Sequence, residues 1–287
     1  MDNSLQASPD LAERQSNTRA GASPPHGPND PPWGSGIALA VWIVSVLLIV
    51  IVPSIFLAPY ALMQNPPLLD NAQLVEFAKS DKTAILLQVL AVIPAHVITL
   101  LLGWIVVTQF RKYPFREMLG WNSGGMKWWH HIVILVFFGV VAAVVSSYFP
   151  EQENDLTRML RSSQAVVFVV AFLATFTAPL VEELVYRGIL FSAFQRTMGV
   201  FAAFIAVTSL FAIIHVPQYY PSWSTIGLLF LLSFILTGIR IYTKNLWPCI
   251  VLHTLFNGIQ SVGLVIAAIY PNAENTAAPA FLLHIFK

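Results

Sequence analysis

The sequence predicts an all-α fold, a polytopic integral membrane bundle of seven to eight transmembrane helices. Three observations support this prediction. The chain of 287 residues is 56% hydrophobic and only 10% charged, whereas a soluble domain carries about 25% charged residues. Seven stretches approach the roughly 20 apolar residues that a helix needs to cross a bilayer. Lys and Arg are also divided unevenly between the two sides that these stretches would connect.

Residues 1–36 differ in composition from the rest of the chain. They are rich in Pro, Asn, Ser, Gly and Ala, and they contain six prolines. Such a segment buries too little apolar area to offset the entropy that it loses on ordering, so we expect a disordered N-terminal tail. No basic start with a short apolar run and a small-residue cleavage site is present, so we expect no cleaved signal peptide. The transmembrane helical domain then comprises residues 37–287.

The spanning helices follow one another along this domain. Each is expected where the chain is apolar over about the thickness of a bilayer, in the stretches Ile37–Tyr60, Ala84–Thr108, His131–Phe149, Ala165–Phe194, Val200–Val216, Thr225–Tyr242 and Leu246–Tyr270. A shorter run, Ala277–Phe286, is expected to be an eighth half-span or an interfacial segment. The fourth stretch is too long for one crossing and contains Pro179, which predicts a kink there or an extension beyond the membrane.

The distribution of basic residues predicts the orientation of the bundle. With the N-terminus in the cytoplasm, ten Lys and Arg residues fall on the inner side and five on the outer side, as the positive-inside rule requires. The loop from Arg111 to Lys127 supplies most of this bias, and the acidic loop Glu151–Asp155 then faces outward. We therefore expect a multi-pass protein of the cell membrane with a cytoplasmic N-terminus. The net charge of +1 gives no indication of a nucleic-acid partner.

The fourth apolar stretch contains three charged residues, Glu182, Glu183 and Arg187, in the pattern Glu-Glu-x-x-x-Arg. Each charge at the centre of a spanning helix costs about 2.5–3.5 kcal/mol on insertion scales, so the three are expected to pair. Glu183 and Arg187 are four residues apart and lie on one helix face. Glu182 lies about 100° round the helix. We interpret Arg187 as neutralising and orienting Glu183 while Glu182 faces a site; the alternative is a helix end where all three are merely solvated.

Two later stretches add further polar groups. His215 lies near the end of the fifth stretch, and His253 and Asn257 lie four residues apart in the seventh, on one face of its helix. Ionisable groups inside a membrane are functional by default, so these residues are expected to join the glutamates in one site. His96 in the second stretch has no polar companion at helical spacing, and we interpret it as a packed core residue.

Other membrane-protease chemistries lack the residues that they need. No His-Glu-x-x-His sequence occurs, which excludes a zincin-type site on one helix. All six aspartates lie in tails or loops, which excludes a pair of intramembrane aspartates. A serine nucleophile needs a nearby base, and no Gly-x-Ser-x-Gly sequence is present. The chemistry that remains is a water activated by a glutamate and assisted by histidines.

The three motifs, in this order on successive apolar helices, resemble the CAAX-prenyl-protease and bacteriocin-processing (CPBP, Abi) family of intramembrane endopeptidases. The sequences that flank them agree, over Glu182–Gly188, Ser209–His215 and Asn245–His253. The resemblance covers a protease-like core at about residues 165–258. Residues 1–160 match nothing beyond spanning helices.

The resemblance, taken with the helical spacing, implies a role for each residue. Glu182 would act as the general base on the attacking water, aided by His215. His253 and Asn257 would donate hydrogen bonds to the oxyanion of the tetrahedral intermediate. The glutamate–arginine pair beside them would support this geometry. Counting residues along the helices places the site in the cytoplasmic half of the bilayer.

The residues alone do not decide whether a metal ion is bound. Glu182, His215 and His253 could make a three-ligand Zn²⁺ site with a free position for water. Asparagine is a poor zinc ligand, so Asn257 favours the metal-free version of the mechanism. No other cofactor-binding motif is found.

The predicted function is therefore an intramembrane endopeptidase that hydrolyses a peptide bond of a membrane-associated or lipidated peptide or protein. One alternative is a non-catalytic membrane immunity or scaffold protein that keeps the motifs for helix packing. Another is a proton-coupled transporter that uses Glu182 and the histidines as a relay. The sequence shows no inverted repeat, which disfavours the transporter.

Overall fold

Seven apolar helices dominate the structure, a computed structural model that describes residues 26–122 and 125–270. Within these residues no β-strand is formed, and the seven helices are long and apolar enough to cross a membrane. They are α2 (Ser35–Leu62), α4 (Lys82–Thr108), α6 (Trp128–Tyr148), the composite helix Gln164–Met198, α11 (Val200–Tyr219), α12 (Trp223–Thr243) and α13 (Trp247–Ile269). The predicted fold class is confirmed, and the run at 277–286 lies outside the described residues.

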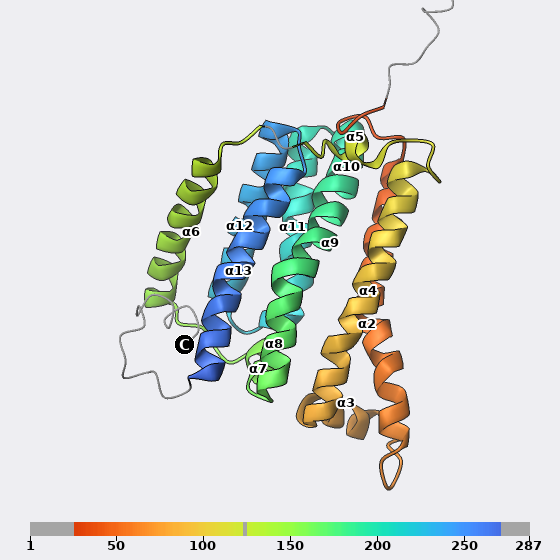
Figure 1. Cartoon of the computed structure of the whole chain (residues 1–287), viewed down its shortest axis with the longest axis vertical. Helices are drawn as coiled ribbons and strands as arrows, with labels where there is room; N and C mark the ends of the chain where they lie inside the picture. The colour runs from red at the N-terminus through yellow and green to blue at the C-terminus, as the bar shows by residue number, and fades with distance from the viewer. Residues whose placement is uncertain (1–25, 123–124, 271–287) are drawn as a thin grey trace, which may run out of the picture.

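Short helices connect the spanning ones at the two ends of the bundle. α3 (Asn71–Ser80) and α7 (Asp155–Leu160) lie at one end, and α5 (Phe115–Leu119) lies at the other, beside the start of α2 (Figure 1). Carboxylates cap α3 and α4, because a side-chain oxygen satisfies the backbone N–H groups that begin a helix. Asp81, for example, accepts from the first turn of α4.

The spanning helices form three groups (Figure 1). α2 and α4 pair along one side, α6 stands at the opposite side, and the composite helix lies between them with α11, α12 and α13. The main contacts of α6 are with α12 and α13. Many of its apolar side chains are exposed, as expected for side chains that face lipid; they include Ile132, Val133, Val136, Phe137, Val140 and Val144.

The composite helix contains two π-helical turns. α8 (Gln164–Phe172) is followed by the π-helical turn η1 (Leu173–Thr177), and α9 (Ala178–Glu183) by the π-helical turn η2 (Leu184–Leu190). α10 (Phe191–Met198) completes the run. Single π turns inside α-helices are frequent at functional sites. The residues Glu182 and Glu183 lie between the two.

Pro179 explains where the first π turn lies. The N–H of Ala178 bonds to the carbonyl of Leu173, five residues back rather than four. The carbonyl of Ala174 would next accept from residue 179, but proline has no N–H to donate. The composite helix is continuous through Pro179 with a π turn before it, and its 35 residues exceed the roughly 20 that one crossing needs, as the sequence predicts.

Residues 26–34, which belong to the predicted N-terminal tail, contact the composite helix. The indole of Trp33 is 1% exposed and donates to the carbonyl of Ile189 at 3.1 Å. Arg196 in turn donates to the carbonyl of Trp33. This segment therefore packs on the end of the composite helix. Its composition suggests disorder because the partners of Trp33, on the composite helix, lie more than 150 residues away in the sequence.

Candidate active site

Glu183 and Arg187 form a fully buried ion pair on the composite helix. Arg187 Nη1 donates to Glu183 Oε1 at 2.9 Å, and both side chains are 0% exposed. The i, i+4 spacing brings the two charges to one face of the helix. Each charge would be costly to bury alone, so removing either partner leaves an uncompensated charge in an apolar environment.

Helix α12 supplies the remaining partners of Arg187. Nη2 donates to Ser233 Oγ at 2.7 Å and to the Ser233 carbonyl at 3.1 Å, and Nε donates to Thr237 Oγ1 at 3.3 Å. The guanidinium carbon also lies 4.9 Å from the centroid of the Phe211 ring. Every guanidinium nitrogen therefore has a partner, and the composite helix is fixed to α12 at this level.

His253 lies between the two glutamates. Its Nδ1 is 2.8 Å from Glu183 Oε1, and its Nε2 is 3.7 Å from Glu182 Oε2. Nδ1 is the donor to Glu183, because an ionised carboxylate can only accept. The second separation is too long for a direct hydrogen bond, but it is a distance that one water molecule can bridge. The side chain of Glu182 is 25% exposed, in contrast to that of Glu183.

His215 is half-buried on α11 and has a different partner. Its Nδ1 donates to the Phe211 carbonyl, four residues back on its own helix, at 2.7 Å. Its ring stacks near the Phe211 ring, with centroids 4.8 Å apart, and the Phe211 ring lies 6.1 Å from that of His253. Among the described residues, no hydrogen bond joins His215 to either glutamate or to His253.

Asn257 compensates for the irregularity of the composite helix. Its Nδ2 donates to the carbonyl of Ala174 at 2.9 Å, which is the carbonyl that Pro179 leaves free. One of the two amide protons is used in this contact, and the second remains for another acceptor. Asn257 thus joins α13 to the π turn in addition to lining the cavity described next.

A cavity of about 1630 Å³ connects the four predicted site residues. Glu182, His215, His253 and Asn257 all line it, on three different spanning helices. Most of its remaining wall is apolar, so a charged group in this cavity meets a low-dielectric environment in which electrostatic interactions are strong. The structure therefore brings Glu182 and His253 within one water of each other, and it places His215 and Asn257 on the same cavity.

His96 is buried and hydrogen-bonded, as expected for a packed core residue, and it also lies on this cavity, which the sequence did not indicate. His96 on α4 lines the cavity and is 7% exposed, and its Nδ1 lies 2.8 Å from Thr177 Oγ1 in the π turn η1. The Thr177 hydroxyl also donates to the Leu173 carbonyl. His96 therefore has a polar partner on another helix. Spacing within a single helix gives no signal of such a contact.

The predicted zinc ligands do not form a ready metal site in this arrangement. Among residues 26–122 and 125–270, no three His, Cys, Asp or Glu side chains lie close enough together to hold a metal ion. His253 and His215 each donate from Nδ1, to a carboxylate and to a backbone carbonyl, which leaves Nε2 of each ring as the nitrogen that could bind a metal ion. Zn²⁺ binding at Glu182, His215 and His253 therefore stays a prediction.

Comparison with known proteins finds a family similarity over about a third of the chain. Residues 163–259 match the family model described as Rce1-like, type II CAAX prenyl endopeptidase Rce1-like. The match covers about the same residues as the three motifs, so the predicted family resemblance is confirmed there. It supports, at the level of the family, a membrane-embedded peptidase of the CAAX type. No curated protein and no solved structure matches the chain.

Proposed function

We propose that this protein is an intramembrane endopeptidase in which Glu182 activates the attacking water. The observation that carries the proposal is the position of His253, with Nδ1 2.8 Å from one glutamate and Nε2 3.7 Å from the other. Both side chains also line the cavity, so a water bound beside the pair can contact the acid and the imidazole while the carbonyl that it attacks occupies the cavity. The family match over residues 163–259 supports the same class of reaction.

In the proposed reaction the water oxygen attacks the carbonyl carbon of the scissile peptide bond. Glu182 takes the proton that the water loses, and the carbonyl oxygen becomes an oxyanion. As the intermediate collapses, the C–N bond breaks and Glu182 gives its proton to the leaving nitrogen. The products are a new carboxyl terminus and a new amine, and Glu182 returns to its starting state.

His253 and Asn257 stabilise the oxyanion. Because Nδ1 of His253 donates to Glu183, the ring contacts the oxyanion through a proton held on Nε2, and the oxyanion takes the place of the charge that Glu182 loses when it accepts the proton from water. Asn257 contributes the amide proton that Ala174 does not use. Removing one oxyanion donor typically costs about 2.7–4 kcal/mol of transition-state stabilisation. His215, on the facing wall of the cavity, assists Glu182.

The Glu183–Arg187 pair positions the imidazole. Glu183 Oε1 accepts from both Arg187 and His253, so the ring is oriented by a carboxylate that is itself fixed by a buried arginine. A histidine's ring orientation and tautomer are set by the partner of its other nitrogen. Glu183 therefore acts through His253 and takes no part in proton transfer.

The proposed substrate is a peptide or protein segment held at the membrane, by a lipid group or by its own apolar residues. The cavity that leads to Glu182 is bounded by spanning helices and is mainly apolar. A segment that is already concentrated at the bilayer reaches such a site by diffusion within the membrane. We place the protein in the cell membrane with its N-terminus in the cytoplasm, because Lys and Arg gather on that side.

Cleavage of membrane-anchored peptides by the purified protein in liposomes tests the proposal. A peptide library with a fluorophore and a quencher on either side of the cleavable segment should give a signal with the wild-type protein. His253→Gln should lower the rate by about 10²-fold or more, because it removes the imidazole. Cleavage at the wild-type rate by His253→Gln would contradict the mechanism. Proton-coupled flux without cleavage would favour the transporter.

A chelator separates the metal-free reaction from a zinc-dependent one. We expect the rate of peptide cleavage to be unchanged after treatment with a membrane-permeant chelator of divalent metals. Loss of cleavage that added Zn²⁺ restores would show instead that Glu182, His215 and His253 rearrange around an ion. The same preparation without chelator is the control.

A further inference from the structure

The cavity reaches only one end of the bundle. From Glu182 and His253 it extends toward the end that carries α3 and α7. There its lining includes polar residues of the loop before α7, of α7 and its surroundings, and of α13; they are Glu151, Gln152, Glu153, Thr157, Arg161, Gln164 and Gln260. We call this opening the mouth. None of the lining residues lies within 100–134, 187–210 or 233–252, the segments that lead to the opposite end.

The opposite end is closed by packed side chains. Trp33, Leu119, Ile189 and Leu246 are at most 1% exposed and belong to one apolar cluster. Next to them the guanidinium of Arg240, also fully buried, donates to three groups: the carbonyls of residues 187 and 28 and a serine hydroxyl at residue 192. Residues 26–34 thus close this end, which we call the sealed end.

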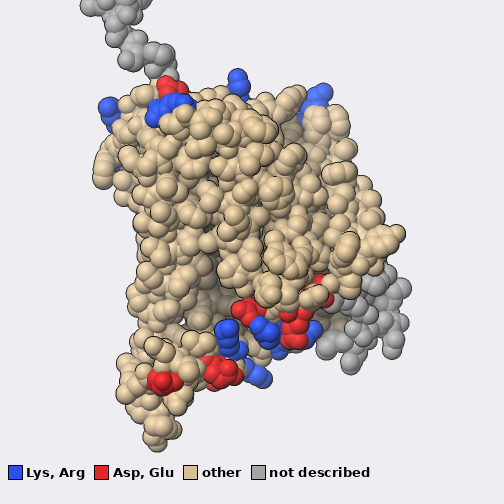
Figure 2. Space-filling model, turned by 180° about the vertical axis from the view of Figure 1, so that it is seen from behind, with Lys and Arg blue, Asp and Glu red and all other residues tan. Residues whose placement is uncertain are grey.

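Charge also distinguishes the two ends (Figure 2). The sealed end carries mainly basic residues, Arg111, Lys112, Arg116, Lys127, Arg196 and Lys244, with the acidic residues Asp30 and Glu117. The mouth end carries Lys79, Lys82, Arg158 and Arg161 with the acidic residues Asp70, Glu76, Asp81, Glu151, Glu153 and Asp155. Figure 2 shows basic side chains along the upper rim and mixed charges at the lower end, with the surface hollowed above them. The positive-inside rule places the sealed end in the cytoplasm.

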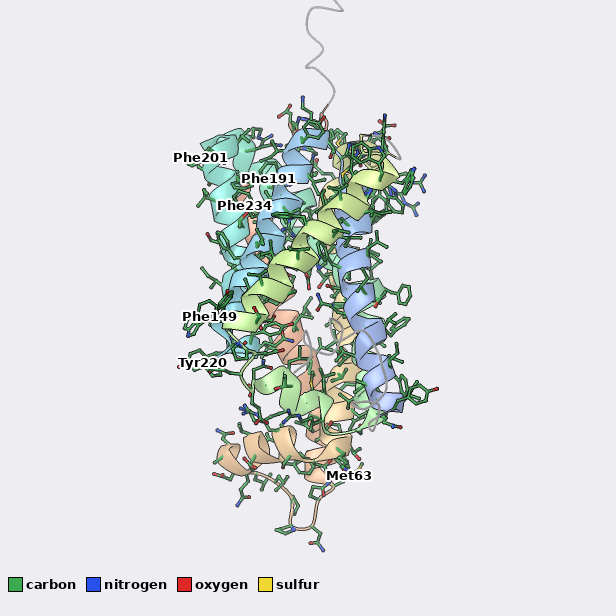
Figure 3. All side chains as sticks on the ribbon, turned by 90° about the vertical axis from the view of Figure 1, so that its left-hand side faces the viewer. Met63, Phe149, Phe191, Phe201, Tyr220 and Phe234 are labelled. Carbon is green, nitrogen blue, oxygen red and sulfur yellow. The ribbon has the colours of Figure 1, made fainter. Side chains whose placement is uncertain are left out.

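Helix α6 borders the cavity on the same side. Figure 3 shows α6 crossing the bundle obliquely, so that its end at Phe149 lies toward Tyr220 and away from α13. Residues of α6 from Leu135 to Ser146 line the cavity together with residues of α13 from His253 to Ala268. The cavity is therefore bordered by both helices in the half of the bundle that is farther from the sealed end.

We infer that the site is reached from the non-cytoplasmic side, through the mouth, and that its substrate is a peptide segment presented at the outer leaflet. The mouth offers carboxylates and amides to an extended, hydrated peptide backbone, while the apolar part of the cavity wall, on α6 and α13, accommodates an apolar anchor. The site itself was expected in the cytoplasmic half of the bilayer; its opening faces the other way. Cleavage through the mouth rests on the proposed peptidase function, whereas the direction of the opening does not.

Cysteine labelling in intact cells tests the direction of the opening. The native Cys249 is fully buried, so Cys249→Ala gives a cysteine-free background. Gln260→Cys then reports on the mouth and Lys112→Cys on the sealed end, since both residues are exposed. A membrane-impermeant maleimide should label Gln260→Cys in intact cells and Lys112→Cys only after permeabilisation. The reverse pattern, or a cysteine at 260 that no reagent reaches from either side, would overturn the inference.

A second measurement connects the mouth to the reaction. In proteoliposomes, a bulky maleimide on Gln260→Cys should slow cleavage at least tenfold relative to the same variant before labelling. The same reagent on Lys112→Cys should leave the rate unchanged. Equal rates before and after labelling at position 260 would show that substrate does not pass the mouth. If no preparation cleaves, the peptidase function fails, while the labelling pattern in cells still decides the direction of the opening.

Discussion

Polar groups are buried among protein partners in the half of the bundle between the site and the sealed end, whereas in the half toward the mouth they face the cavity. In the sealed half, the guanidinium groups of Arg187 and Arg240 are buried among hydroxyls, carbonyls and one carboxylate. In the mouth half, Glu182 and His215 line an open cavity. The boundary runs between two adjacent residues, because Glu183 faces the sealed half and Glu182 the cavity. The same type of side chain thus has a structural role on one side of the boundary, in Glu183, and a chemical role on the other, in Glu182.

This difference between the two halves predicts whether a substitution changes the stability of the protein or its cleavage rate. A buried polar group whose partners are all protein atoms contributes to folding, because its removal leaves those partners unsatisfied. A polar group that faces a cavity keeps its access to water or substrate, and its removal costs little stability. Substitutions in the sealed half should therefore lower the melting temperature, and those in the mouth half should lower the cleavage rate.

The largest effect on stability is expected for Arg187→Met. It leaves Glu183 as a buried charge without its ion-pair partner, which costs about 3–5 kcal/mol. The purified variant should melt well below the wild type in detergent, or fail to accumulate in the membrane. Arg158→Met is the matched control, because Arg158 pairs with Asp155 on the surface and exposed pairs contribute about 0–1 kcal/mol. Equal melting temperatures for the two variants would remove the distinction between the halves.

Asn257→Leu tests a residue that belongs to both halves. It leaves the Ala174 carbonyl without its donor, at a cost of about 1–3 kcal/mol for a buried unsatisfied group, and it also removes one oxyanion donor. Both the melting temperature and the cleavage rate should fall, the rate by about 10²-fold at a temperature where the variant is folded. A lower melting temperature with an unchanged rate would make Asn257 a structural residue alone.

The smallest effect is expected at the mouth, for Glu151→Gln. Burial raises the pKa of the Glu151 carboxyl above its usual value, although the hydrogen bond from Asn154 opposes this rise. The folded protein therefore binds this proton more tightly than the unfolded chain, and the wild type loses stability as the pH rises through the raised pKa. Glu151→Gln removes that dependence and can still accept from Asn154.

The melting temperature of Glu151→Gln should accordingly equal that of the wild type in acid and exceed it slightly at neutral pH. The gain should stay below about 1 kcal/mol, because the side chain is partly solvated. A melting curve taken at several pH values for both proteins checks the direction. A variant that is less stable than the wild type at neutral pH would contradict the assignment of a raised pKa.

The spanning helices could be predicted from the sequence because lipid leaves the backbone few choices. A bilayer offers no hydrogen-bond partners, so each apolar stretch must satisfy its backbone internally as a helix. The start of α11 at Val200 and the end of α4 at Thr108 are as predicted. The i, i+4 pairing of Glu183 with Arg187 followed from helix geometry in the same way.

What the sequence did not reveal depends on contacts between distant segments. The π turn before Pro179 needs the amide of Asn257 to satisfy the free carbonyl, and the two are 83 residues apart. His96 and Thr177 form a hydrogen bond although they are 81 residues apart in the sequence. The periodicity of either helix alone therefore does not predict this contact. Residues 26–34 are ordered because Trp33 and its carbonyl find partners on the composite helix. Composition alone contains no information about such partners.

The central claim is that Glu182 performs the chemistry and that the fold does not depend on it. The direct test is the rate at which wild-type protein and Glu182→Gln cleave the same membrane-anchored peptide in proteoliposomes, with melting temperatures measured on the same preparations. We predict equal melting temperatures and a rate that falls by about 10³-fold or more, because the amide cannot accept the proton from water. A folded Glu182→Gln that cleaves within a few-fold of the wild-type rate would contradict the claim.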